Sequence, residues 1–227
     1  MKLVIGNKNY SSWSMRPWIA LKAAGIPFDE EVISLYVDGS REQILKHSPA
    51  GKVPILIDGD TRVWESLAIL EYAADKFPAA RLWPADLAAR AHARAIATEM
   101  HGGFVPLRQQ CSMNMWRPPQ RIALTADAQA NVDRVQEIWS EARTRFGAGG
   151  PFLFGAFSAA DAMYAPIVSR FETYAVEVNP TCAAYMAAMI ALPSWQEWRR
   201  GALRETWVIE KFEKDWPNVP RLSVAAA

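Results

Sequence analysis

Residues 51–58 read GKVPILID, and residues 64–66 follow as WES. A proline has no N–H to donate to a β-ladder, so Pro54 at the head of an apolar run marks the first residue of a strand or a special turn, a cis peptide bond being one form of it. The backbone of Val53 is then free to pair with another segment. This stretch predicts an extended sheet edge beside which a second extended chain can lie.

A helix start follows this edge closely. Ser66 opens an amphipathic helical pattern twelve residues after Pro54, and the first turn of a helix offers unpaired N–H groups and a positive dipole end to an anion. The neighbouring Glu65 can pair with an ammonium group. An extended edge near an anion-binding helix end suits a short peptide that carries a free carboxylate and a free amine.

Composition and charge exclude several classes of protein. The chain has 227 residues, 51% hydrophobic and 22% charged, which is enough for a sizeable core in one large or two modest domains. Its 25 Lys and Arg residues nearly balance 24 Asp and Glu residues, so we expect binding to neither nucleic acid nor a membrane. The apolar run near the N-terminus is too short for a signal peptide or a membrane span, and we expect a cytoplasmic protein.

Cysteine and histidine usage indicates no metal site. Cys111 and Cys182 are 71 residues apart and form no CxxC pair, so we expect two buried free thiols. The three histidines, His47, His92 and His101, match no metal-ligand spacing and are expected at the surface or in the core.

Strands and helices alternate in the first part of the chain, and only helical periods follow it. Strands are predicted at 2–5, 31–35, after Pro54 and at 62–64, with helices at 14–24, 40–45 and 66–77. The later helices are predicted at 85–111, 126–146, 158–174, 181–191 and 194–203. The fold class is therefore α/β plus all-α, with domains at 1–79 and 87–227 joined by a linker at 80–86.

This order of elements resembles the cytosolic glutathione transferase family, and the resemblance covers essentially the whole chain. The Val53-Pro54 pair, the Glu65-Ser66 pair and FSAAD at 157–161 carry it, each in the expected place. The resemblance implies a thioredoxin-like N-terminal domain of βαβαββα order and an all-helical C-terminal domain. Independently of the family, the SxxD spacing of Ser158 and Asp161 predicts a capping box that serves folding.

Within this family the chain most resembles the zeta class and other serine-type members. That resemblance places the catalytic residue in the stretch NYSSWS at 9–14. Ser11 is the expected residue, with Ser12 and Tyr10 as alternatives. A thiol with a pKa near 8.5 is only a few per cent thiolate at neutral pH, and a donated hydrogen bond near a helix start favours the charged form. Trp13 replaces the cysteine of the zeta pattern SSC, which weighs against a zeta-type isomerase.

The resemblance also names the ligand, with glutathione as co-substrate. Val53, next to Pro54, is expected to exchange backbone hydrogen bonds with its cysteinyl residue. Ser66 is expected to bind the γ-glutamyl carboxylate, Glu65 the γ-glutamyl amine, and Lys52 to approach the glycyl carboxylate.

The second substrate is expected between the domains, where residues 101–119 are rich in Met, Trp and Phe and also contain Arg108 and Gln109. We expect a glutathione transferase that attacks a small apolar electrophile, in a homodimer as in most of the family. A zeta-like isomerase and a noncatalytic glutathione- or hydrophobe-binding protein are the alternatives. A cysteine-type thiol reductase is disfavoured because no cysteine precedes residue 111. The tail from Trp207, with Phe212 and Trp216, is expected to fold back over the first domain.

Overall fold

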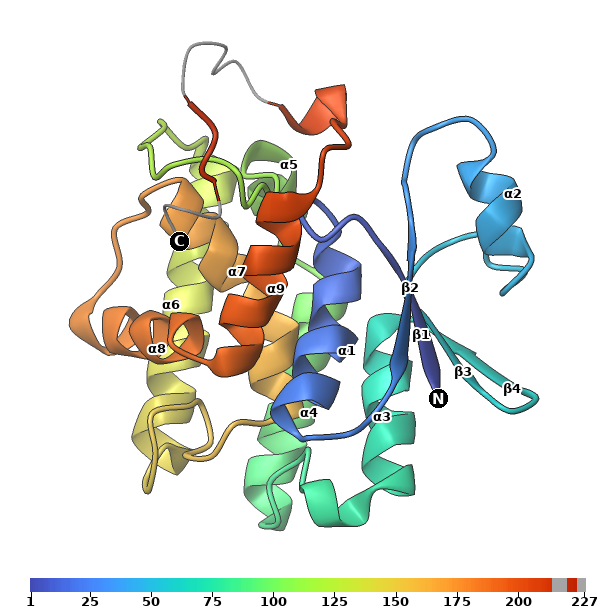
Figure 1. The fold of residues 1–227 in the computed structure, drawn as a ribbon. Helices are drawn as coiled ribbons and strands as arrows, with labels where there is room; N and C mark the ends of the chain where they lie inside the picture. Colours follow the sequence, from blue (N-terminus) through green and yellow to red (C-terminus); the bar gives the residue numbers. More distant parts are fainter. Residues whose placement is uncertain (214–219, 224–227) are drawn as a thin grey trace.

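A computed structural model describes residues 1–213 and 220–223, and it contains one mixed four-stranded sheet with helices packed beside it (Figure 1). The strand order is β2-β1-β3-β4, in which β1 runs parallel to β2 and antiparallel to β3, and β4 runs antiparallel to β3. This is the predicted thioredoxin-like order. The strands are β1 Lys2–Gly6, β2 Asp29–Ile33, β3 Ile55–Asp58 and β4 Thr61–Trp64.

Helices follow the predicted order, so the predicted fold class is confirmed. Only helices and short 3₁₀ turns appear as regular elements after β4 among the described residues, apart from isolated bridges at 152–156. Their bounds are α1 Ser12–Ala23, α2 Ser40–Leu45, α3 Ser66–Lys76, η1 Pro78–Ala80, α4 Leu87–Gly102, α5 Val105–Gln110, α6 Ala126–Phe146, α7 Ala159–Thr173, α8 Pro180–Ile190, α9 Pro193–Arg204 and η2 Glu210–Phe212.

The predicted helix over 85–111 is wrong in one respect, because the chain breaks after Gly102. Gly103 takes an extended conformation and Phe104 has a positive φ of 58°, which no helix interior accommodates. Pro106 then occupies the first turn of α5, where its missing N–H costs no helical bond. Apolar residues continue through the break at helical spacing, so periodicity alone did not reveal it.

The core is continuous between the sheet and the helical region. Helix α1 packs against α7, and in Figure 1 it lies between the sheet and the helices of the later part of the chain. Every residue of α7 except Glu172 is buried. The predicted capping box of Ser158 and Asp161 is present at its start, with Ser158 N donating to the Asp161 carboxylate at 2.8 Å. That cap fixes the helix against which the first part of the chain packs.

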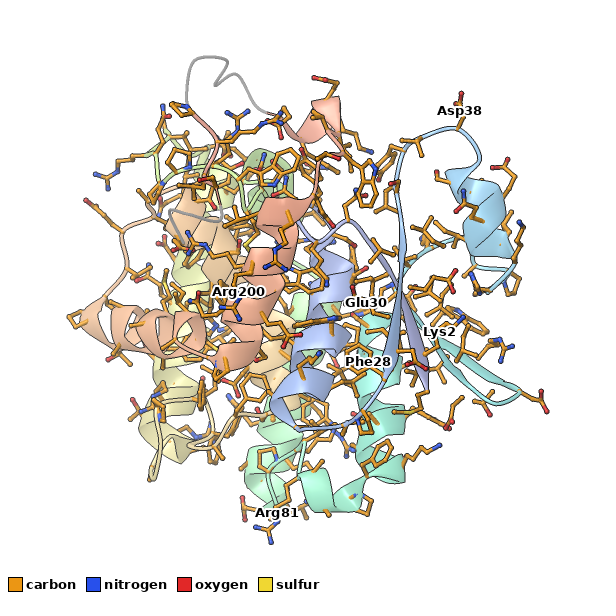
Figure 2. The ribbon with its side chains drawn as sticks, in the orientation of Figure 1. Lys2, Phe28, Glu30, Asp38, Arg81 and Arg200 are labelled. Atoms are coloured by element: carbon orange, nitrogen blue, oxygen red, sulfur yellow. The ribbon has the colours of Figure 1, made fainter. Side chains whose placement is uncertain are left out.

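Two acidic side chains fix the connection between β1 and α1, which carries the predicted catalytic residues. Glu30, which Figure 2 shows on the side of β2 toward α1, accepts from Lys8 Nζ at 2.7 Å and from Trp18 Nε1 at 2.5 Å. Glu205, just after α9, accepts from the backbone N–H groups of Lys8 and Asn9 at 2.6 and 2.9 Å. The connection is therefore held from both the sheet and the helical region.

Other predictions concern thiols, metals and membranes. Both cysteines are buried free thiols, as predicted. Within the described ranges, no group of three or more His, Cys, Asp or Glu side chains is placed to hold a metal ion. Within the same ranges, no helix is both long and apolar enough to cross a membrane.

Candidate active site

A cavity of about 880 Å³ opens beside the start of α1. Its walls come from the β1–α1 connection, from the segment around α2 and Pro54, from the β4–α3 junction, and from α5, the segment after it and α7. All but one of the predicted site residues line it: Tyr10, Ser11, Ser12, Lys52, Val53, Pro54 and Glu65.

Ser11 lies at the N-terminus of α1 with its hydroxyl beside a second serine. It is the residue before the helix, its side chain is 6% exposed, and its Oγ lies 2.7 Å from Ser14 Oγ. Ser14 Oγ in turn accepts from Gly6 N at 3.0 Å. Ser11 is the donor in this bond, so a ligand that accepts the Ser11 proton must replace Ser14 as its partner.

Ser12 and Tyr10 have hydroxyl groups with other partners. Ser12 Oγ accepts from Arg170 Nη2 at 3.4 Å. Tyr10 donates to the Glu213 carboxylate at 2.5 Å and its ring packs edge-on against Trp116. Burial and the adjacent Glu213 raise the pKa of the Tyr10 phenol. Of the three candidates, Ser11 holds the position immediately before α1, and Ser12 next to it also lines the cavity.

The Pro54 segment lies immediately before β3. The Val53-Pro54 peptide bond is cis, and the ladder to β1 starts one residue later with the pair Val4 and Ile55. Val53 is half-buried, lies at a bend outside that ladder, and lines the cavity. Lys52 is exposed at the same wall.

The β4–α3 junction carries Glu65 and Ser66. Glu65 has a φ of 67°, a left-handed conformation uncommon for a residue other than glycine, and such strain concentrates at binding sites. Its exposed carboxylate lies 3.4 Å from His101 Nε2. Ser66 is the first residue of α3 and is fully buried, with its Oγ accepting from Arg16 Nη1 at 3.4 Å. Ser66 thus lies under the cavity surface rather than on it.

The helical wall contains part of the stretch expected there. Met113, Arg108 and Gln109 line the cavity, whereas Met115 does not line it and accepts from Ser169 Oγ at 3.7 Å. The aromatic and sulfur-rich stretch is therefore partly core and partly cavity wall.

Several lining residues escaped the sequence reasoning. His101, expected to be at the surface or in the core, lines the cavity, and burial together with Arg16 lowers its pKa. Arg170 was missed, although an arginine inside a helix that is otherwise apolar was a visible signal. The tail was expected to fold back over the first domain, and its residue Phe212 lines the cavity beside that part of the chain. Trp216, named in the same prediction, lies outside the described residues.

Comparisons with known proteins identify the family to which this chain is similar. Sequence models of the glutathione S-transferase N-terminal domain and C-terminal domain match residues 10–76 and 124–201. The maleylacetoacetate isomerase of Rattus norvegicus is 32% identical over 197 residues, covering 82% of this chain and 87% of that relative. The dichloromethane dehalogenase of Methylorubrum extorquens is 45% identical over 60 residues, covering 26% of this chain and 21% of that relative.

Solved structures show the same fold. A glutathione transferase homologue from Burkholderia, with bound glutathione, is 25% identical, has a TM-score of 0.64, and matches over 88% of this chain and 98% of its own. A maleylpyruvate isomerase, described as a bacterial zeta-class glutathione-S-transferase, is 22% identical and has a TM-score of 0.69. The match covers 91% of this chain and 100% of the isomerase chain. The fold and the site thus define a thioredoxin-like protein with a helical second part. The chain belongs to the glutathione S-transferase family.

Proposed function

We propose that this protein is a glutathione transferase that binds glutathione in the 880 Å³ cavity and promotes attack by its sulfur on a small apolar electrophile. The single observation that carries the proposal is convergence: the N-terminus of α1 at Ser11, the Val53 segment before β3 and the start of α3 at Glu65 meet at one cavity. Each part alone occurs in many proteins. Together they match the thiol, the peptide backbone and the γ-glutamyl end of one tripeptide.

In this proposal the peptide lies extended along Val53. Its cysteinyl backbone exchanges hydrogen bonds with Val53, as in strand addition, beside the cis Pro54 bond. The γ-glutamyl carboxylate lies at the α3 N-terminus above Ser66, the γ-glutamyl amine pairs with Glu65, and Lys52 approaches the glycyl carboxylate.

The thiol then reaches the start of α1. The Ser11 hydroxyl donates a hydrogen bond to the sulfur, and the positive end of the α1 dipole further stabilises a negative charge there. Both effects lower the thiol pKa, and the thiol proton leaves to solvent. The thiolate attacks the electrophile, forming a carbon–sulfur bond as the leaving group departs with its electron pair. Ser11 stabilises the nucleophile and forms no covalent bond.

Single substitutions test these roles with 1-chloro-2,4-dinitrobenzene as the electrophile and calorimetry for glutathione binding. Ser11→Ala should lower kcat about 10- to 100-fold, the value of one hydrogen bond to a charged group, with little change in glutathione affinity. Ser40→Ala, which removes another hydroxyl from the cavity wall, is the matched control and should keep full turnover. A protein that binds glutathione but shows no turnover even in wild type would be the noncatalytic alternative.

The binding residues need their own variant. Glu65→Ala combined with Ser66→Ala should weaken glutathione binding at least about 10-fold, because the variant loses the Glu65 ion pair and the bond of Ser66 Oγ to Arg16 at the start of α3. Unchanged glutathione affinity in this double variant would show that the peptide lies elsewhere.

Glutathione-dependent isomerisation is the second candidate. Similarity to a maleylacetoacetate isomerase over 82% of the chain favours it, whereas Trp13 in place of the zeta-pattern cysteine weighs against it. Assay of maleylacetoacetate with and without glutathione separates the two reactions, since isomerisation regenerates glutathione and conjugation consumes it.

We also propose a linker at 80–86 between parts at 1–79 and 87–227, because the 3₁₀ turn Pro78–Ala80 follows α3 and α4 begins at Leu87. A homodimer and a cytoplasmic location remain predictions. Sedimentation at several concentrations tests the first, and fractionation of the producing cell tests the second.

A further inference from the structure

Three arginines gather at the helical side of the cavity. Arg108 of α5 and Arg170 of α7 line it, and Arg16 of α1 is 1% exposed beside them. The guanidinium carbons of Arg16 and Arg108 lie 4.2 and 4.7 Å from the centre of the Trp13 ring. Arg170 reaches Ser12 Oγ at 3.4 Å. These positive groups therefore lie close to the proposed thiol position.

Within the described residues no carboxylate forms a direct ion pair with this cluster, and Glu65 acts on Arg16 only at longer range. In the part of the chain that the structure describes, none of the three arginines forms an ion pair with an acidic side chain, although fourteen such pairs occur elsewhere. Neutral oxygens hold them instead, and these satisfy donors without cancelling charge. The contacts are Arg170 to the Cys111 and Pro166 carbonyls at 2.7 and 3.2 Å, Arg108 to the Gly103 carbonyl at 3.2 Å, and Arg16 to Ser66 Oγ at 3.4 Å.

The positive charges of the three arginines repel one another. Burial and the neighbouring guanidiniums lower the pKa of Arg16 and Arg170, and the pKa of about 10 for Arg170 keeps that group charged at neutral pH. Among the described residues that line the cavity, Glu65 is the one carboxylate, and it already lies against His101. An excess of positive charge in a partly enclosed space favours an anionic ligand.

We propose that this wall binds a carboxylate carried by the second substrate, with Arg108 as the specificity-determining residue. The inference rests on the proposed glutathione chemistry. Arg170 donates most of its hydrogen bonds to main-chain carbonyls, whereas Arg108 is half-buried and donates to one carbonyl. The remaining N–H groups of the planar Arg108 guanidinium can therefore bind a carboxylate through two hydrogen bonds. Met113 and Val105 supply apolar surface nearby. The substrate is then an apolar electrophile with an anionic end.

The same arginines could serve glutathione itself, so the probe must separate the two uses. In the proposed binding mode the two glutathione carboxylates lie at the α3 N-terminus and near Lys52. Stabilisation of the thiolate is excluded with glutathione S-conjugates, which have no free thiol. A suitable pair is S-(4-carboxy-2-nitrophenyl)glutathione and S-(4-carbamoyl-2-nitrophenyl)glutathione, which differ only by a carboxylate and its neutral amide.

Calorimetry of both conjugates tests the site without requiring turnover. Wild type should bind the carboxylate conjugate at least about 10-fold more tightly, as expected for a charge-assisted hydrogen-bonded pair. R108Q should reduce that preference at least about 5-fold, and R108K, which keeps the charge, should retain more of it. R41Q removes a positive charge of α2 from a different wall of the same cavity and should leave the preference intact.

The outcomes separate this inference from the proposed function. Glutathione binding with equal affinities for the two conjugates overturns the anionic site and leaves the transferase proposal standing. A preference that R108Q leaves unchanged overturns the role of Arg108. Failure of wild type to bind glutathione or either conjugate contradicts the proposed function itself. The wild-type comparison stands even if R108Q does not fold, which thermal unfolding of that variant would show.

Discussion

Replacing Glu205 by glutamine should remove a specific pH dependence of folding stability. The Glu205 carboxylate accepts two backbone N–H groups, from Lys8 and Asn9, and so holds the connection before Ser11. Burial raises the pKa of Glu205 to about 7, and the nearby Glu30 adds to this, against the lowering by the two N–H bonds and by Lys8. The cost of burying the charge therefore exceeds the gain from its hydrogen bonds.

The sign and size follow from linkage. A carboxyl whose pKa is higher in the folded than in the unfolded chain binds more protons when folded, so its contribution to stability is present at low pH and is lost as pH rises through the folded pKa. With a pKa of about 7 when folded and 4.5 when unfolded, the loss between pH 5 and pH 8 is about 2.5 kcal/mol. A glutamine cannot titrate, so E205Q lacks this loss.

Denaturant unfolding, followed by the fluorescence of the ten tryptophans, measures the difference at several pH values between 5 and 8. The stability advantage of wild type over E205Q should shrink by about 2.5 kcal/mol across this range. Other titrating groups cancel, because both proteins contain them. Glu210→Gln, at an exposed position nearby, is the matched control and should follow wild type. A constant advantage, or one that grows with pH, would refute the reasoning.

Two further substitutions test parts of the account. Asp161→Ala removes the acceptor for Leu153 N, Ser158 N and Ser158 Oγ at 3.0, 2.8 and 2.7 Å, so unfolding should become easier by about 3 kcal/mol or more; a loss under about 1 kcal/mol by denaturant titration would contradict the role of the cap. Tyr10→Phe removes the bond to Glu213 and should leave the pKa of the bound glutathione thiol unaltered in an ultraviolet titration, whereas an increase would make Tyr10 the sulfur partner.

The sequence was informative where one local pattern determines the structure. Pro54 excludes a ladder hydrogen bond wherever it lies, so the start of a strand there was predictable. Ser158 and Asp161 form their cap within four consecutive residues, which makes it visible as a spacing. The break at Gly103 was missed because apolar residues such as Leu107 keep helical spacing through it.

The helical wall of the site could not be predicted in the same way. Arg170 meets Ser12 across 158 residues, and Tyr10 meets Glu213 across 203 residues. No periodicity within either segment encodes such a pairing, since it depends on how α1 packs against α7 and on where the tail returns. Local patterns therefore identified Ser11, Val53 and Glu65, which line the cavity, but not the positive charge of the helical wall.

The most direct test of the account is the pKa of the glutathione thiol in the binary complex, read from the ultraviolet absorbance of the thiolate in wild type, S11A and S40A. In wild type, one charge-assisted hydrogen bond and the α1 N-terminus should place this pKa about one to two units below the free value of about 8.5. S11A should raise it by at least about one unit and S40A should not change it. A bound thiol that titrates like free glutathione, or an S11A complex that matches wild type, would contradict the claim that Ser11 activates the sulfur.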